Sequence, residues 1–524
     1  MNKRLNLLII VVCFQLGMLA MHFQTQAQER RGPQPPATEN AGQQKDKLPP
    51  AQPDVTTTGS VTVEGQRIDY QAVAGTIPLL DENEQDTTAR MFYVAYFKQG
   101  VSDVSTRPLT FLYNGGPGSA TIWLHMGAFG PRRVVIDSTI HMHGAPYELV
   151  NNDYSLLDAT DLVFVDAPGT GFSRVMPGKE KDYYGVDQDG RAFSQFIMRF
   201  ITKYGRWNSP KFLFGESYGT TRSAVLSSML QNMYDIDLNG VILLSQILSF
   251  DNSIDGPSRN PGNDMPYILG LPTFAATAWY HHQLPQNHPD LEAFIREVEN
   301  FATGAYAQAL MKGATLDPNT FNQIAEQLHQ YTGLDVDYIK KANLRVDGGE
   351  FEQQLLNKQG LTTGRLDTRF SGPSLDILSQ RANYDPQSEA ISGAYVSLFN
   401  DYVRKVLKYG QNMDYHPTIY GRMQWDWTHG GSRMGVNVMN DLATAMKKNP
   451  TLKVLLNAGY YDLATPFYEG VYELQHLPIP NDLQKNIEYA FYESGHMVYL
   501  HVPSLKQLHD RTKQFIESCY TPAH

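Results

Sequence analysis

A serine between two glycines is the first candidate nucleophile in the sequence. Residues 215–219 read GESYG, so Ser217 lies in a G-x-S-x-G pattern. A short strand-like run, 211–214, precedes it, and a stretch with helical apolar spacing follows as far as Leu230. Glycines on both sides of the serine permit a sharp strand-to-helix turn that exposes the hydroxyl at the edge of a sheet. The pattern predicts that Ser217 is a catalytic nucleophile.

A nucleophilic serine requires a base to accept its proton and an acid to orient that base. In α/β-hydrolases these residues follow in the order Ser, Asp, His. Asp462 comes just after the apolar run 452–457, and His496 lies further along in the sequence Gly-His-Met. Taken singly, Asp462 could be a turn or capping residue and His496 an ordinary loop histidine. Their order after Ser217 favours an acid and a base.

A glycine-rich loop could supply the oxyanion hole. Residues 114–118 read NGGPG and follow the strand-like run 109–113. Such a loop can present backbone N–H groups at close range, so we expect the N–H groups of Gly116 and Tyr218 to bind the oxyanion. A plain turn is the alternative interpretation. A phosphate-binding P-loop is excluded because no Gly-Lys-Ser/Thr follows.

These residues require a sheet that places them at one edge. An alternating pattern around Glu64-Gly65 predicts a β-hairpin. Further strands are predicted at 91–97, 109–113, 161–165, 211–214, 241–244 and 452–457. Strands that alternate with helical stretches predict an α/β fold with a mainly parallel, doubly wound sheet.

The chain divides by composition into five parts. Residues 1–27 have a basic start, an apolar stretch and a small residue at the end, which is typical of a signal peptide. An uncleaved membrane anchor is the alternative, and the apolar stretch is short for a span. Residues 28–55 are rich in Pro and Gln and predict a disordered tether. We expect the body in two parts, 56–250 and 436–524. The block between them, 251–435, has helical spacing at 291–310, 319–331 and 388–409, which predicts a mostly helical cap.

Several motifs together resemble the serine carboxypeptidase family of the α/β-hydrolase fold. They are NGGPG, VDAPGTGFSR at 165–174, GESYG, a Gly-x-x-Asp-x-x-x-Pro run from Gly459 to Pro466, and Gly-His-Met at 495–497. The resemblance implies the triad Ser217, Asp462 and His496 with an oxyanion hole at Gly116 and Tyr218. It also implies that Asn114, Gly115 and Glu216 bind the C-terminal carboxylate of a peptide substrate.

The sequence departs from that family at three positions near these motifs. Leu112 stands where members carry Trp, Ser119 where they carry Cys, and Ala128 where they carry a second Glu. Half of the acid pair that the resemblance implies for carboxylate binding is therefore missing. A serine peptidase that releases C-terminal residues is the favoured function. An esterase or acyltransferase with the same triad, and an inactive scaffold or binding protein, are the alternatives.

Composition and net charge limit the partners and cofactors that the protein can have. The 524 residues carry a net charge of −11, which argues against a nucleic-acid partner. Only Cys13 and Cys519 occur, so a disulfide framework and a Cys-based zinc site are excluded. The His pairs at 141–143 and 281–282 lack a third ligand, so we expect neither a metal nor another cofactor. With the signal peptide removed, we expect no stable membrane insertion and a periplasmic or extracellular bacterial location.

Overall fold

A ten-stranded sheet forms the centre of the protein, in the order β1-β2-β3-β7-β4-β9-β10-β13-β14, with β8 beside β3. The neighbours from β7 to β14 are parallel, and the pairs from β1 to β7 are antiparallel. The strands are β1 (Val55–Val63), β2 (Gln66–Leu80), β3 (Thr87–Lys98), β4 (Leu109–Tyr113), β7 (Asp161–Val165), β8 (Arg174–Val175), β9 (Lys211–Glu216), β10 (Gly240–Leu244), β13 (Lys453–Gly459) and β14 (Ile487–Tyr492). This computed structural model describes residues 47–81, 83–136, 139, 141, 143–432 and 435–520.

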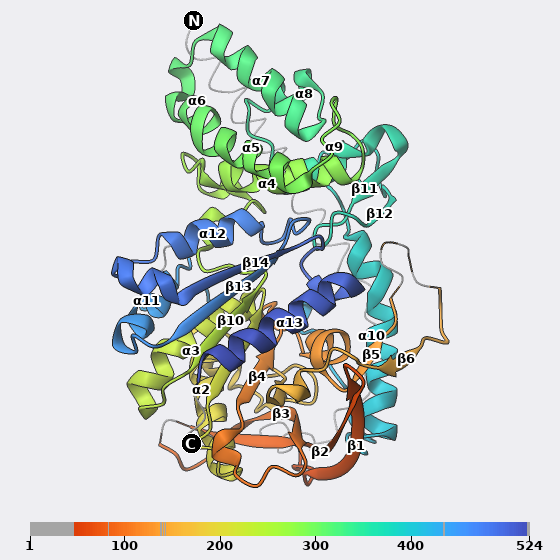
Figure 1. Ribbon diagram of the computed structural model, residues 1–524, viewed down its shortest axis with the longest axis vertical. Coiled ribbons are helices and arrows are strands. Elements are labelled where there is room, and N and C mark those ends of the chain that lie inside the picture. The colour runs from red at the N-terminus through yellow and green to blue at the C-terminus, as the bar shows by residue number, and fades with distance from the viewer. Residues whose placement is uncertain are drawn as a thin grey trace, which may run out of the picture. The chain divides into compact units, whose positions relative to one another are not determined.

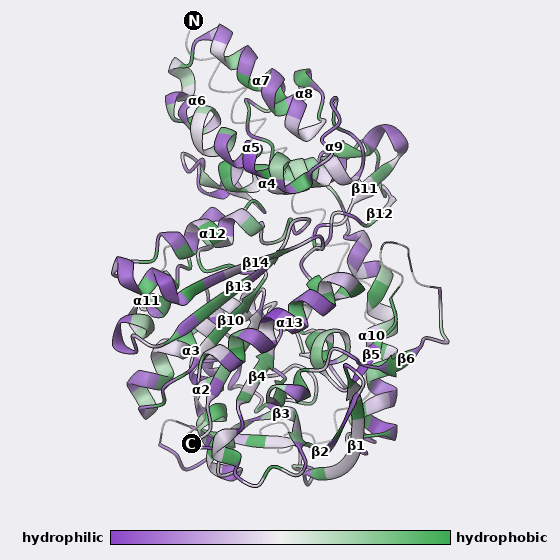
Figure 2. Cartoon of the chain, viewed as in Figure 1, coloured by the Kyte–Doolittle hydropathy of each residue, from purple (hydrophilic) through white to green (hydrophobic). Residues whose placement is uncertain are grey.

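Helices cover both faces of the sheet (Figure 1). On one face α2 (Val186–Lys203), α3 (Tyr218–Tyr234) and α11 (Met439–Lys448) bury apolar side chains against the strands. On the other face α13 (Val502–Ser518), α10 (Pro386–Lys405) and the π-helix η2 (Leu124–Phe129) do the same. Strands β4 and β10 are largely hydrophobic in Figure 2, as strands buried on both faces must be. The predicted α/β-hydrolase class, with its mainly parallel sheet, is confirmed.

The predicted hairpin at the start of the sheet is present. Strands β1 and β2 pair antiparallel up to Val63 and Gln66. Glu64 and Gly65 have φ values of 48° and 80°, so both residues of the turn are left-handed, as a tight two-residue hairpin requires.

A separate apolar core lies in the insertion between β10 and β13. Ile254, residues from α4 to α9 and Leu463, which follows β13, form this cap core. Figure 1 shows the helices of the cap in green beyond the ends of β13 and β14. The helices are α4 (Met265–Tyr280), α5 (Leu291–Phe301), α6 (Ala307–Lys312), α7 (Pro318–Thr332), α8 (Val336–Lys341) and α9 (Gly348–Leu355). Helix α10, by contrast, buries Ala394 and Tyr395 in the core of the body. The block predicted as a cap, 251–435, therefore contributes to two cores.

The signal peptide predicted over 1–27 and most of the tether predicted over 28–55 lie outside the described residues. The last residues of that tether contact the body. Arg90 Nη1 donates to the carbonyl of Pro49 across 2.6 Å, and the Tyr93 hydroxyl donates to Asp54 across 2.9 Å. Packing against the body thus begins before residue 56. Within the described ranges, no helix is both long and apolar enough to cross a bilayer.

Candidate active site

Ser217 lies in a sharp turn between β9 and α3. Its backbone has φ 60° and ψ −130°, and its N–H donates to the carbonyl of Leu244 across 2.9 Å. A Cβ on Gly215 would lie 2.1 Å from the Gly219 carbonyl oxygen, and one on Gly219 would lie 2.9 Å from that of Tyr113. The predicted strand–turn–helix is present, and these contacts explain why glycine is needed on both sides of the serine.

Asp462 and His496 form a buried pair at the ends of β13 and β14. His496 Nδ1 donates to Asp462 Oδ2 across 2.8 Å. The same carboxylate accepts bonds from the N–H groups of Ala464 and Thr465, both at 3.0 Å, and from the Thr465 hydroxyl at 2.8 Å. Asp462 is fully buried and His496 is 3% exposed. The carboxylate is thus fixed, and it leaves His496 Nε2 free to act as a base.

The pKa of His496 is raised although the ring is buried. Burial opposes a positive charge on the ring, but the carboxylate of Asp462 and its hydrogen bond outweigh burial and raise the pKa of His496. The backbone of His496 is held as well, since its carbonyl accepts from Ser245 Oγ across 2.7 Å. No hydrogen bond joins Ser217 to His496 in the part of the chain that the structure describes. Such bonds commonly tighten only when substrate binds.

The NGGPG loop lies against the start of α3. A Cβ on Gly115 would be 2.4 Å from the Tyr218 nitrogen, so only glycine permits this approach. Arg222 of α3 donates to the carbonyl of Asn114 across 2.8 Å and so fixes the first residue of the loop. Gly116, with φ 110°, lines the same cavity as Ser217 and Tyr218. The two residues predicted to donate to the oxyanion, Gly116 and Tyr218, therefore border the same cavity as Ser217, and their role stays a prediction.

Glu216 and Asn114, two of the predicted carboxylate-binding residues, are close neighbours and are buried. Burial raises the pKa of Glu216 to about 7, while the charge of His496 and hydrogen bonds from Tyr499 and Asn114 work against this rise. Tyr499 donates its hydroxyl to Glu216 Oε2, a contact that sequence reasoning missed. Its only sequence signal is its place three residues after His496.

Two of the departures from the family pattern are side chains inside the core. Leu112 in β4 and Ala128 in η2 are both fully buried. Ser119 accepts a hydrogen bond from Trp123 Nε1 across 3.1 Å. The structure therefore has an apolar core at two positions where the family carries Trp and Glu.

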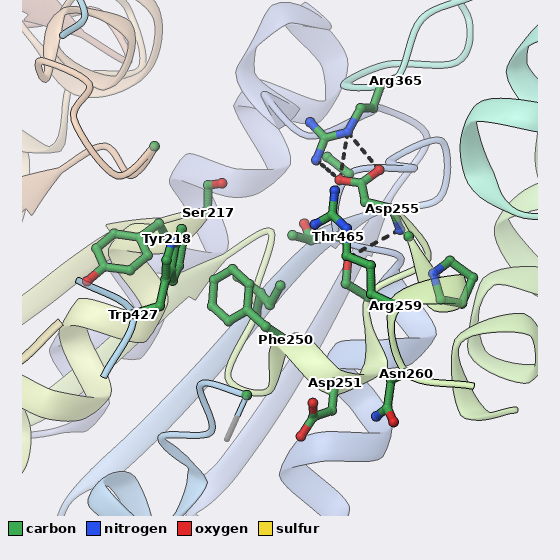
Figure 3. A pocket seen from close by; sticks show the side chains of 17 residues that line it. Ser217, Tyr218, Phe250, Asp251, Asp255, Arg259, Asn260, Arg365, Trp427 and Thr465 are labelled. Carbon is green, nitrogen blue, oxygen red and sulfur yellow. Dashed lines mark hydrogen bonds and ion pairs between the residues drawn. The ribbon is translucent and has the colours of Figure 1, made fainter. Parts of the chain in front are cut away.

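A cavity of about 640 Å³ opens beside Ser217 (Figure 3). Phe250 and Trp427 form an aromatic wall near Tyr218, with the Phe250 and Trp427 rings 5.1 Å apart. Arg259 and the ion pair of Arg365 with Asp255 line another part of the cavity. A volume of this size suits a small molecule or a short peptide segment. Neither Glu216 nor Asn114 lines it.

A family model described as serine carboxypeptidase matches residues 68–504. The chain belongs to the serine carboxypeptidase family. Curated relatives include serine carboxypeptidase-like 28 of Arabidopsis thaliana, 24% identical over 43% of this chain and 46% of that protein. Another is the pheromone-processing carboxypeptidase KEX1 of Saccharomyces cerevisiae, 32% identical over 26% of this chain and 18% of that protein. The matched regions thus span less than half of these relatives.

The solved structure of the prohormone-processing carboxypeptidase KEX1 of Saccharomyces cerevisiae has the same fold as this serine carboxypeptidase family member. The TM-score is 0.52 at 16% identity, over 86% of this chain and 92% of that chain. No cluster of three His, Cys, Asp or Glu side chains fit for a metal occurs among the described residues. His281, one of the candidate ligands, donates from Nε2 to the carbonyl of Thr368 across 2.7 Å.

Proposed function

We propose that the protein is a serine carboxypeptidase that releases C-terminal residues from peptides through an acyl-enzyme. The observation that carries the proposal is the 2.8 Å bond between His496 Nδ1 and Asp462. Asp462 also accepts bonds from Ala464 and Thr465, which line the same cavity as Ser217. The bond between His496 and Asp462 fixes the tautomer in which Nε2 accepts a proton from a serine.

In the proposed reaction, Ser217 Oγ attacks the carbonyl carbon of the last peptide bond and His496 Nε2 takes the hydroxyl proton. The negative charge on the carbonyl oxygen is stabilised by the N–H groups of Gly116 and Tyr218. His496 then protonates the departing amine, and the C-terminal residue leaves. Water, deprotonated by His496, hydrolyses the ester on Ser217 and restores the enzyme.

We further propose that Asn114, Gly115 and Glu216 bind the substrate carboxylate. None of the three lines the cavity beside Ser217, so the carboxylate must reach beyond that lining to contact them. A neutral Glu216 donates a hydrogen bond to that carboxylate, whereas an ionised Glu216 repels it. The raised pKa of Glu216, about 7, supports a neutral carboxyl at acid pH. The free carboxylate is then the feature that selects the last peptide bond.

Export is also a proposal. The basic residues Lys3 and Arg4, followed by a long apolar stretch, support a cleaved signal peptide and a periplasmic or extracellular location. Fractionation of expressing cells, with the N-terminus of the mature protein sequenced, tests it. An intact N-terminus in the cytoplasmic fraction would contradict it.

The decisive experiment uses a fluorophosphonate probe and a peptide library with free and amidated C-termini. We expect the probe to label Ser217 and the enzyme to release single residues from free-acid peptides alone. Labelling with equal hydrolysis of acids, amides and esters would favour an esterase or acyltransferase. The presence of Ala128 in place of a second acid is the observation that supports this alternative. Absence of labelling would favour an inactive scaffold.

A further inference from the structure

A short loop of the insertion contacts both loops that carry the proposed acid and base. Residues 364–370, here called the brace, connect β11 (Leu361–Thr363) to β12 (Ser371–Pro373). The brace accepts a bond at the Arg365 carbonyl from Leu463 N–H, across 3.1 Å. Thr368 donates from its N–H at 2.9 Å and from its hydroxyl at 3.2 Å to the Tyr461 carbonyl. Both contacts are one residue away from Asp462.

The same brace holds the loop of His496. The His496 N–H donates to the Leu366 carbonyl across 2.6 Å. Arg369 donates from Nη1 to the Glu493 carbonyl at 3.0 Å and from Nη2 to Ser494 Oγ at 3.1 Å. The packing is tight here, because a Cβ on Gly495 would lie 2.5 Å from that of Asp367. The backbone on both sides of Gly495 is therefore fixed by one loop.

Buried bonds hold the brace itself in one conformation. Arg369 forms a fork with Asp367, at 2.9 Å from Nε and 2.6 Å from Nη2, and both side chains are almost fully buried. Asp385, the N-cap of α10, accepts from the N–H groups of Arg365 and Leu366. The Thr368 hydroxyl also lies 2.6 Å from that of Thr277 in α4. The brace is thus tied to the body and to the cap.

We propose that Thr368 and Arg369 are positioning residues, which set the orientation of the His496 ring toward Asp462 and Ser217. The inference rests on the proposed triad. A catalytic geometry needs alignment to within about 0.5 Å, and displacement by about 1 Å can reduce a rate roughly 10²-fold. The segment 364–370 restrains the loop of Asp462 and the loop of His496 together, so a change in this segment affects both loops. Thr368 and Arg369 can act in this way without contact to substrate.

The test compares two variants of the brace with matched controls elsewhere in the cap. Arg369→Gln removes the bonds to Glu493 and Ser494 in the loop that carries His496. Thr368→Val removes the hydroxyl bond to the Tyr461 carbonyl, next to Asp462. Arg345→Gln is the control for the first, because Arg345 forms a fork of the same geometry with Asp264, in a more exposed position, and also reaches the Leu310 carbonyl. Thr332→Val is the control for the second, because its hydroxyl bonds the Leu328 carbonyl inside α7.

We expect kcat of Arg369→Gln to fall by roughly 10²-fold and that of Thr368→Val by roughly 10-fold, with KM nearly unchanged. Arg369→Lys keeps the charge beside Asp367 and should recover part of the loss. The controls should keep wild-type kcat even where their thermal midpoints fall. Wild-type kcat in both brace variants, or equal kcat losses in variants and controls of equal thermal stability, would overturn the proposal.

A pH profile separates positioning from general loss of structure. The charged groups that act on His496 are Asp462, Glu216 and Arg365, and Asp462 raises the pKa of His496 most strongly. A looser bond to Asp462 lowers that pKa, so the acid limb of kcat/KM should move to lower pH in Thr368→Val, which changes no charge, and stay in place in Thr332→Val. An acid limb that does not move in Thr368→Val contradicts the proposal.

Fluorophosphonate labelling keeps this inference distinct from the proposed function. The rate of labelling reports activation of Ser217 and needs no peptide. If the wild type is labelled but cleaves no peptide, the carboxypeptidase proposal fails, while slower labelling of the two brace variants still supports the brace. If both brace variants are labelled at the wild-type rate, the brace proposal fails alone. Should Arg369→Gln not fold, Thr368→Val decides the matter.

Discussion

The hydroxyl of Tyr499 donates a hydrogen bond to Oε2 of Glu216 across 2.9 Å. Both side chains are buried. Burial raises the pKa of Glu216 to about 7; the charge of His496 and this bond hold the pKa below the value that burial alone would impose. A tyrosine outside the sequence motifs thus affects the protonation of the carboxyl proposed to recognise substrate.

Removal of that hydroxyl should shift the pH dependence. In Tyr499→Phe the ionised form of Glu216 loses a donor, so its pKa rises and the neutral form persists to higher pH. We expect the alkaline fall of kcat/KM for free-acid peptides to move to higher pH. The measurement is kcat/KM from pH 4 to 9 on matched acid and amide peptides. Tyr306→Phe, which loses a buried hydroxyl bond to the Leu344 carbonyl in the cap, is the control and should keep the wild-type profile.

Replacement of Glu216 by Gln should remove the alkaline fall on free-acid peptides, because Gln is a neutral donor at every pH. The free energy of unfolding should also depend less on pH in Glu216→Gln than in wild type. The pKa of Glu216 is raised from 4.5 to about 7, so its contribution to stability is complete below pH 4.5 and is lost as pH rises through 7. We therefore expect chemical denaturation to show a smaller stability loss between pH 4.5 and 8 in Glu216→Gln than in wild type. Equal losses would contradict a raised pKa.

Ser217→Ala should abolish turnover and leave the fold intact. Loss of a triad serine typically reduces kcat by about 10⁶, and alanine fits the space of serine. Progress curves on peptides and fluorophosphonate labelling measure the effect, and the thermal midpoint checks the fold. Ser227→Ala, which loses a buried hydroxyl bond inside α3, serves as the matched control and should retain full activity. Retention of even roughly a tenth of the activity in Ser217→Ala would refute the assignment.

Introduction of the missing acid should destabilise the protein. Ala128 is fully buried within η2, where its carbonyl accepts from Asn152 Nδ2 across 2.8 Å. Ala128→Glu adds a larger polar side chain to a packed core, which typically costs about 1–3 kcal/mol in free energy of unfolding. Urea denaturation of Ala128→Glu measures the loss, with Ala128→Ser as a small polar control. Unchanged stability together with tighter binding of free-acid peptides would show that space for a second acid exists.

Thiol reagents should leave activity unchanged. Cys519 is the free cysteine in the described part of the chain, at the end of α13, and burial raises its pKa to about 12. At neutral pH the group is then a thiol, which is a poor nucleophile. Peptidase assays before and after iodoacetamide treatment test this. Inactivation of wild type but not of Cys519→Ser would indicate that the thiol affects the site.

The central strands were predictable because each is a short apolar run buried on both faces. The predicted runs 109–113 and 161–165 have the same bounds as β4 and β7. Strand β14 was missed, since a strand at the edge of the sheet has mixed burial and carries Glu488 among its residues. Helix α4 was missed for the opposite reason: it is apolar all round, so it lacks helical periodicity.

The candidate site was partly predictable. The turn at Ser217 and the order of Asp462 and His496 follow from short motifs, and their catalytic roles stay predictions until tested. Tyr499 and the brace have no such signal. Most of the brace bonds involve backbone carbonyls and N–H groups, which any residue type supplies, so their positions depend on the tertiary fold rather than on local sequence.

The cap core has a consequence for how members of this family can diverge. Its apolar side chains run from Ile254 to Leu356 and pack mostly against one another, and Leu463, the residue after Asp462, also belongs to this core. Exchanges away from Leu463 are therefore absorbed within α4 to α9 and leave β9 and the turn at Ser217 undisturbed. Natural variation can therefore accumulate in the cap and reshape the approach to the cavity while the reaction chemistry is inherited intact. The brace sets the boundary of that freedom, since a drift at 364–370 would reach Asp462 and His496 at once.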